Sequence, residues 1–189
     1  MTDHAHPTTR TERATMADAA YQGPTIRPLE PRDRDQVMAI LHAVGNFSSD
    51  EIDTALELID EWLTLGEASD YLTYVVESDS EPAPATDRTV MGYVCYGPTP
   101  LTESTYDLYW IAVSPSAQRG GYGRALLAFA ESDIARRGGR RVLIETGSHE
   151  TYASTVRFYE RAGYGLISRI PDYYRPGDDK LTFGRPLPY

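Results

Sequence analysis

The sequence predicts a mixed α/β (α+β) fold, in which a central sheet of about seven strands carries about four helices packed on both faces. Short apolar runs bounded by glycine and proline alternate with helical periods in the order β-α-α-β-β-β-α-β-α-β-β. That order gives antiparallel hairpins first, then one β-α-β crossover with a parallel strand pair, and a final hairpin. With 189 residues, the chain has the length of a single domain.

Two helices follow a short strand near the start of the predicted domain. Residues 25–29 predict the strand, and Pro31 suits the first turn of a helix that runs to about Val44. A second helix follows, with Ser49 or Asp50 as its cap. The apolar residues of both helices recur at intervals of three and four, which is the helical period: Val37, Ile40, Leu41 and Val44, then Ile52, Leu56, Ile59 and Leu63.

Strands dominate the middle of the chain. Two strands at 72–76 and 90–96 are separated by a loop that contains Pro82 and Pro84. A third strand at 106–113 leads to a glycine-rich turn. Strict alternation along that third strand would place its residues on two opposite faces, with Tyr106, Leu108 and Trp110 on one and Asp107 and Tyr109 on the other.

The last part of the chain predicts two helices and three strands. Gly138 and Gly139 stop the helix that follows the glycine-rich turn. The remaining elements are a buried strand at 142–146, a helix at 151–162, and strands at 165–170 and 180–185, which are joined through Pro171 and Pro176-Gly177.

The ends and the bulk composition limit the class of protein. Residues 1–23 lack an apolar period and predict a flexible leader, so the single domain spans 24–189. No apolar segment resembles a secretory signal, and no run is long enough to cross a bilayer. Cys95 is the only cysteine and is expected in a buried strand, so a cytoplasmic location is expected. The four histidines show no metal-ligand spacing, so no metal site is expected.

The charge is unevenly distributed. The net charge of −10 argues against a nucleic-acid partner. Residues 30–81 hold fourteen acidic residues against two arginines, whereas residues 117–141 hold six arginines against two acidic residues. The basic stretch surrounds the glycine-rich turn and suits a ligand with several phosphates. The acidic stretch is compatible with a cationic partner or with solubility alone.

The glycine-rich turn runs from Gln118 to Arg124 and lies between a predicted strand and a predicted helix. Backbone N–H groups converge at such a turn, and the helix dipole is positive there, so the turn is suited to a phosphate group. A P-loop is excluded because no Lys-Ser or Lys-Thr follows the glycines. A dinucleotide fingerprint is excluded because its third glycine position holds Leu126.

The remaining pattern, Q-x-x-G-x-G with flanking arginines, resembles the pyrophosphate loop of the GNAT family of N-acetyltransferases. The segments I-A-V-S-P before the loop and F-Y-E-R-A-G-Y at 158–164 resemble the same family, and the element order matches its fold over about residues 25–188. The resemblance implies acetyl-CoA (coenzyme A) as the cofactor. The cofactor contacts that it implies are Ile111, Ala112, Val113, Gln118, Arg119, Gly120, Gly121, Tyr122, Gly123, Arg124, Tyr152 and Phe158.

The resemblance also implies two catalytic residues. Tyr159 matches the tyrosine that the family places beside the coenzyme sulfur, where it can protonate the departing thiolate. Asp107 lies six residues before Val113, where many members carry an acidic base, usually Glu. Many members have Asn where this chain has Tyr152, so the polar contact from that helix to the cofactor stays open.

The acceptor is the least defined part of the prediction. The aromatic residues expected to line its pocket are Tyr106, Tyr109, Trp110, Tyr173 and Tyr174. They favour acetyl transfer to a small-molecule or amino-acid-like amine. Protein N-terminal or lysine acetylation, and a non-catalytic acyl-CoA sensor, are the alternatives. No nucleic-acid or membrane partner is expected, and a homodimer is left open.

Overall fold

The computed structural model describes residues 24–78 and 88–188. The predicted leader at 1–23 and most of the predicted loop between the second and third strands therefore lie outside the described residues. The helices are α1 (Arg34–Val44), α2 (Ser49–Leu65), α3 (Tyr122–Arg136) and α4 (Ala153–Arg161). The strands are β1 (Ile26–Pro28), β2 (Leu72–Glu77), β3 (Val90–Pro98), β4 (Thr105–Val113), β5 (Arg141–Gly147), β6 (Gly165–Arg175) and β7 (Asp178–Pro186).

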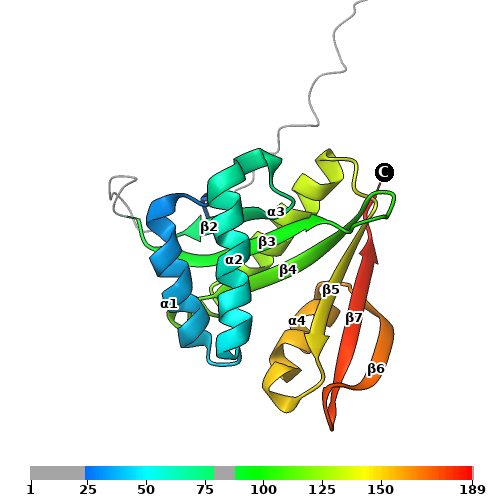
Figure 1. The fold of residues 1–189 in the computed structure, drawn as a ribbon. Helices are drawn as coiled ribbons and strands as arrows, with labels where there is room; N and C mark the ends of the chain where they lie inside the picture. The colour runs from blue at the N-terminus through cyan, green and yellow to red at the C-terminus, as the bar shows by residue number, and fades with distance from the viewer. Residues whose placement is uncertain (1–23, 79–87, 189) are drawn as a thin grey trace, which may run out of the picture.

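The strands form one mixed sheet in the order β1-β2-β3-β4-β5-β7-β6 (Figure 1). All neighbours are antiparallel except β4 and β5, which are the parallel pair that the crossover through α3 requires. The predicted mixed sheet of about seven strands is confirmed.

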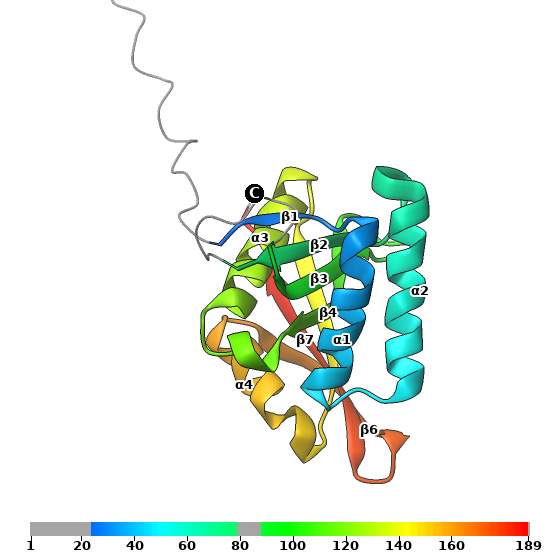
Figure 2. The ribbon, with the colours of Figure 1, turned by 90° about the vertical axis from the view of Figure 1, so that its left-hand side faces the viewer.

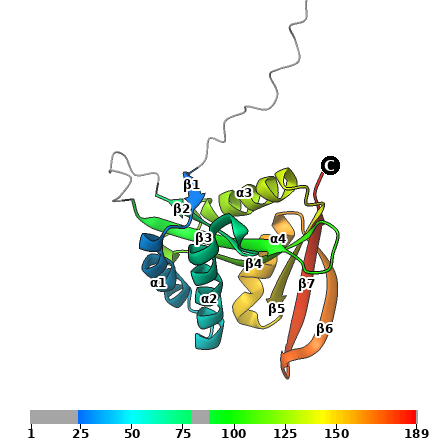
Figure 3. The same ribbon diagram turned by 45° about the horizontal axis from the view of Figure 1, so that its top comes forward.

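The helices cover both faces of the sheet, as predicted. Helices α1 and α2 lie side by side on one face, over β2, β3 and β4, and α3 lies on the other (Figures 2 and 3). Helix α4 is on the α3 side, next to β5 and β7 (Figure 2). The buried strand residues between these layers are mostly valine, tyrosine and leucine, and Cys95 is buried among them as expected.

The predicted cap of α2 was wrong by one or two residues. The side chain of Ser48, and not that of Ser49 or Asp50, accepts the N–H of Glu51, and the Glu51 carboxylate accepts the N–H of Ser48 at 2.7 Å. This reciprocal capping box satisfies two backbone donors that a single cap would leave unpaired. It fixes the residue at which α2 begins.

A bulge in β4 overturns the strict alternation expected from the sequence. Leu108 pairs with Tyr96 and Trp110 pairs with Cys95, so Tyr109 is an extra residue between them. Trp110 therefore lies on the α2 face together with Tyr109, and not with Tyr106 and Leu108. The Trp110 ring packs edge-on against Phe47, with the ring centroids 5.3 Å apart.

β4 and β5 separate after a short parallel pairing. The register joins Thr105–Leu108 to Arg141–Ile144, and β4 continues to Val113 without β5 as a partner. Figure 1 shows the two strands diverging toward α4. The separation leaves one backbone edge of β4, from Tyr109 to Val113, open to a ligand.

The final hairpin is longer than predicted. β6 extends to Arg175 and includes Pro171, which the sequence placed in the connection. A proline is tolerated here because β6 is the edge strand and its pairing with β7 is irregular between Ile170 and Arg175. Residues of β6 are exposed throughout, including Tyr173 and Tyr174, which are 54% and 51% exposed.

An ion cluster ties the first strand to the rest of the sheet. The Arg27 guanidinium lies 2.6 Å from both Asp33 and Glu77, measured from its nitrogens to their carboxylate oxygens. Both carboxylates are almost fully buried. Because Arg27 bonds to both, removing its side chain would leave two buried charges without their main partner.

Candidate active site

The predicted phosphate-binding turn begins α3. A single 3-10 turn (Pro115–Ala117) follows β4, and the chain reverses through Arg119 and Gly121, whose φ angles are +67° and +84°. No side chain caps α3 within the described residues, so the N–H groups of its first turn, from Tyr122 to Arg124, point out of the helix end without a side-chain partner. These donors, together with the positive end of the helix dipole, fit a phosphate group.

Space above this turn is open where a phosphate would lie. A Cβ added at Gly121 would meet no atom within 4 Å, while one at Gly123 would reach Val113 and Phe158 at 3.6 and 3.7 Å. Gln118, Arg119, Gly120 and Arg124 are exposed around the same turn. The sequence-predicted loop residues are therefore together at one helix end, with Val113 and Phe158 below them.

The arginine-rich stretch divides between two places. Arg119 and Arg124 flank the turn, but Arg136 and Arg137 lie at the opposite end of α3. There both bond to the buried carboxylate of Asp133, at 2.7 and 2.6 Å. Of these four arginines, only Arg119 and Arg124 are placed to contact a phosphate. The count of arginines along the sequence therefore overstates the positive charge at the turn.

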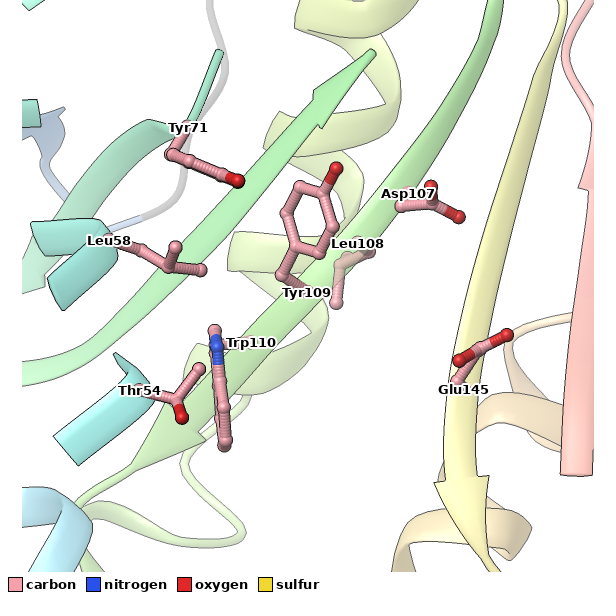
Figure 4. Close-up of a pocket in the computed structure, with 8 residues that line it drawn as sticks. All are labelled: Thr54, Leu58, Tyr71, Asp107, Leu108, Tyr109, Trp110 and Glu145. Atoms are coloured by element: carbon pink, nitrogen blue, oxygen red, sulfur yellow. The ribbon is translucent and has the colours of Figure 1, made fainter. Parts of the chain in front are cut away.

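A cavity of about 420 Å³ opens on the other face of the sheet, where β4 and β5 part (Figure 4). Helix α2 contributes Thr54 and Leu58, and β5 contributes Glu145. The other residues that line it are Tyr71, Asp107, Leu108, Tyr109 and Trp110. Of the predicted acceptor-pocket residues, the structure brings Tyr109 and Trp110 into this cavity.

The other three predicted pocket aromatics lie elsewhere. Tyr106 is on the α3 face, since a Cβ added at Gly139 would meet its ring at 2.9 Å. Tyr173 and Tyr174 stack edge-to-face at 4.9 Å on the protruding hairpin of β6 and β7, outside the cavity lining. Tyr106 lies on the face opposite Asp107 and Tyr109, as alternation along this part of β4 requires, and the length of β6 carries Tyr173 and Tyr174 away from the cavity.

Asp107 lies half-buried in this cavity. Burial raises the pKa of its carboxyl above the ordinary value and the charge of Glu145 acts in the same direction, while the Thr99 side chain and the charge of Lys180 act in the opposite direction. Within the described residues Asp107 forms no ion pair, whereas Glu145 is bonded to Lys180 at 2.7 Å. Asp107 is thus the carboxylate that is available to a ligand, at the position expected for the base.

Tyr159 lies on α4 and is 4% exposed. Its ring packs against those of Phe158, Tyr164 and Phe183, with centroids 5.3, 6.1 and 6.3 Å away. Burial raises the pKa of its hydroxyl well above that of a free phenol. Tyr159 therefore keeps its proton across the neutral range, as a proton donor must, and is a weaker acid than an exposed tyrosine.

Tyr152 has partners other than the expected cofactor. Its hydroxyl donates to the backbone carbonyl of Asn46 at 2.9 Å and lies 3.3 Å from a carboxylate oxygen of Glu51. Its pKa is raised to about 12 by burial and by the charge of Glu51. These bonds join the start of α4 to the loop before α2 across the separated strands, which is a bridging role that the sequence did not indicate.

Five cavity residues were not among the predicted site residues, namely Thr54, Leu58, Tyr71, Leu108 and Glu145. Thr54 and Leu58 are one helical turn apart on α2, which is the spacing of one face. Glu145 is a charged residue that directly follows the apolar run 142–144 of β5, and that contrast was the available signal. Tyr71 precedes β2 and carried no signal.

The model of the acetyltransferase (GNAT) family matches residues 39–164, which include the α3 turn, Asp107 and Tyr159. The chain belongs to the GNAT family. The family expected from the sequence is thereby confirmed, and acetyl-CoA is the cosubstrate of GNAT acetyltransferases. The GNAT match covers about two thirds of the chain and contains both the turn before α3 and the residues that line the cavity.

Individual relatives agree with this assignment. A GNAT-family structure from Desulfovibrio desulfuricans is 40% identical, covers 88% of this chain and 100% of its own, and has a TM-score of 0.79. A Salmonella typhimurium structure with its cofactor acetyl-CoA is 20% identical, covers 88% of this chain and 95% of its own, and has a TM-score of 0.66. The latter likeness supports the fold alone.

A curated relative, the mycothiol acetyltransferase of Cellulomonas flavigena, is 35% identical over 85 residues. The match covers 45% of this chain and 24% of the relative. The GNAT chain described here thus spans about a quarter of the length of that curated relative.

Two kinds of feature are missing from the described part of the chain. Residues 24–78 and 88–188 contain no helix with the length and apolar character to cross a bilayer. The same residues contain no group of three or more histidine, cysteine or acidic side chains arranged to hold a metal ion.

Proposed function

We propose that this GNAT protein transfers the acetyl group of acetyl-CoA directly to the amine of a small-molecule acceptor. One observation carries the proposal: an uncapped helix end suited to phosphate and an acidic, aromatic cavity lie on opposite faces of the same gap between β4 and β5. A coenzyme held at the helix end and an amine held in the cavity would meet within that gap. Direct transfer needs such a meeting point.

The residues around the helix end would hold the coenzyme. The N–H groups of Arg119 and of residues 121–124 would receive the pyrophosphate, since that of Gly120 already donates to the carbonyl of Ala117, and Gln118 and Phe158 lie at the edges of that turn. The open backbone edge of β4 at Ile111, Ala112 and Val113 would pair with the amides of the pantetheine arm. When bound, acetyl-CoA supplies an acetyl group activated as a thioester.

Asp107 would take a proton from the acceptor amine. A lysine-like amine has a pKa of about 10.4, so well under ~0.1% is neutral at pH 7 and the ammonium must be deprotonated before it can react. The carboxylate of Asp107 is in the cavity and lacks an ion-pair partner among the described residues. It receives the proton either directly or through one water.

Tyr159 would supply a proton to the coenzyme thiolate when the carbon–sulfur bond breaks. Its raised pKa keeps the hydroxyl protonated at neutral pH. Its neighbour Phe158 lies within 3.7 Å of the position of a Cβ at Gly123, on the coenzyme side of the gap. The neutral amine forms a bond to the thioester carbonyl carbon as the carbon–sulfur bond breaks, and its nitrogen then loses a second proton, which restores the Tyr159 hydroxyl. The acetylated amine and the free thiol are the two products, and the proton on Asp107 returns to solvent.

The proposal is tested by mixing purified protein with acetyl-CoA and single amines and following thiol release. Release that depends on the amine, with an acetylated product found by mass spectrometry, supports transfer. Tight coenzyme binding with no release from any amine would identify a non-catalytic acyl-CoA sensor instead. Protein with Tyr159→Phe is the matched control, because it should bind the coenzyme and turn over slowly.

A further inference from the structure

The walls of the acceptor cavity are largely aromatic and aliphatic. Tyr71 and Tyr109 pack edge-to-face with centroids 5.3 Å apart, and Leu58 and Trp110 complete the apolar surface (Figure 4). These rings have packing partners that hold them in place, so the apolar surface is formed before a ligand arrives. A ligand body of matching character would gain free energy by leaving water.

The same cavity offers charge for one cation. Glu145 is neutralised by Lys180, and the Lys180 ammonium also lies 5.0 Å from the centroid of the Tyr173 ring. Asp107 is the carboxylate of the lining that forms no ion pair within the described residues. The cavity can therefore compensate one positive charge, and its aromatic rings add an attraction for a cation above their faces.

We infer that the acceptor is a small primary amine with a single positive charge on an apolar, preferably aromatic, body. This inference rests on the proposed acetyl transfer and names its substrate class. A volume of about 420 Å³ is at the lower end of the range of small-molecule sites, roughly 300–1,000 Å³. The single ammonium pairs with Asp107, and the body contacts Leu58, Tyr109 and Trp110.

Other amine classes fit these walls poorly. A second ammonium would be desolvated without a free carboxylate, and an amino sugar such as kanamycin would bring several ammonium groups that lose their water in the same way. A peptide would bring amide N–H and C=O groups to an apolar surface, with the same loss. Selection against these classes thus follows from what the cavity lacks.

The first test compares acceptors in the wild-type protein. With saturating acetyl-CoA, kcat/KM is measured for 2-phenylethylamine, cadaverine, kanamycin and a hexapeptide that begins with alanine. We expect 2-phenylethylamine to exceed each of the others by at least about 10-fold, since one uncompensated charge or polar group costs about that much. Preference for the diamine, the aminoglycoside or the peptide would overturn the inference and leave acetyl transfer intact.

The second test changes the charge of the cavity without touching its core. Thr54 is exposed at the cavity lining, so Thr54→Glu adds a carboxylate there at little risk to folding. It should raise the ratio of kcat/KM for cadaverine to that for 2-phenylethylamine by about 5-fold or more, whereas Thr54→Gln, which matches it in size, should not. An unchanged ratio in Thr54→Glu would place the acceptor outside this cavity.

Failure of the proposed function has a different signature. Acetyl-CoA that binds but releases no thiol with any of the four amines would overturn acetyl transfer, and the acceptor class would fall with it. Binding is followed separately through Trp110, in protein that carries Trp62→Phe so that one tryptophan remains. Quenching by 2-phenylethylamine and not by cadaverine is the result expected from the cavity.

Discussion

Replacing Tyr159 by phenylalanine removes one hydroxyl group from the proposed site and leaves the ring in place. The ring keeps its contacts with Phe158, Tyr164 and Phe183. Within the described residues the hydroxyl makes no hydrogen bond to another residue. We therefore expect the free energy of unfolding to change by less than about 1 kcal/mol, because no internal hydrogen bond is lost.

The expected loss of turnover is set by the leaving group. General acids commonly contribute about 10²–10⁴-fold. A coenzyme thiol with a pKa near 8.5 can also depart as the thiolate at a moderate rate, and burial makes Tyr159 a weaker acid than a free phenol. We expect kcat to fall at least ~10-fold, which corresponds to about 1.4 kcal/mol of activation free energy, with coenzyme affinity nearly unchanged.

The assay is thiol release under saturating amine, with coenzyme affinity measured by calorimetry. Tyr164→Phe is the matched control, since Tyr164 belongs to the same aromatic cluster and its hydroxyl donates to Glu131 at 2.9 Å. It should lower the free energy of unfolding by about 1–2 kcal/mol and leave kcat unaltered. Unchanged turnover in Tyr159→Phe, or an equal loss in both variants, would refute the role of Tyr159 as the proton donor.

Three further predictions concern the helix end, the base and the ion cluster. Gly121→Glu should weaken coenzyme binding more than ~10-fold by titration calorimetry, because it brings negative charge to a phosphate site, while Gly121→Asn, which tolerates the φ of +84°, should bind within a few-fold of wild type. Asp107→Asn should lower kcat/KM about 100-fold near pH 7, and the deficit should shrink as the pH approaches the acceptor pKa of about 10, where the amine arrives neutral. Wild-type activity should fall as the pH drops through the pKa of Asp107, which lies above that of an ordinary aspartate. A loss of kcat/KM in Asp107→Asn that has the same size at every pH would contradict the role of Asp107 as the base. Arg27→Ala should lower the free energy of unfolding in urea by about 3–5 kcal/mol, whereas Arg34→Ala, which breaks the exposed pair with Asp60, should cost less than about 1 kcal/mol; similar losses in the two would argue against a buried cluster.

The fold was predictable because its local signals agree. The order of elements, the crossover at the glycine-rich turn and the helical periods each point to a mixed sheet, and none conflicts with another. The prediction that failed was the alternation of side chains along β4, because the register of β4 against β3 shifts by one residue. No residue type marks the extra residue at Tyr109, because a bulge depends on how β3 and β4 pair, and that pairing is not written in either strand alone.

The two halves of the candidate site also differed in how far the sequence could predict them. The coenzyme side is continuous in sequence from Gln118 to Arg124, so a motif could describe it. The cavity side gathers α2, β4 and β5, which are separated by dozens of residues, and no motif in the sequence links its members Thr54 and Glu145. Tyr152 had an expected ligand contact but forms hydrogen bonds across to Asn46, which only the packing of α4 reveals.

The parting of β4 and β5 has a kinetic consequence. In the proposed arrangement the coenzyme and the amine enter the gap between β4 and β5 from opposite faces of the sheet. Neither ligand therefore blocks the dissociation of the other. A site with one entrance imposes a sequence on arrival and departure, because the first ligand in is the last one out. A sheet that opens between two strands has an entrance on each face, and in this arrangement either ligand can be exchanged while the other stays bound.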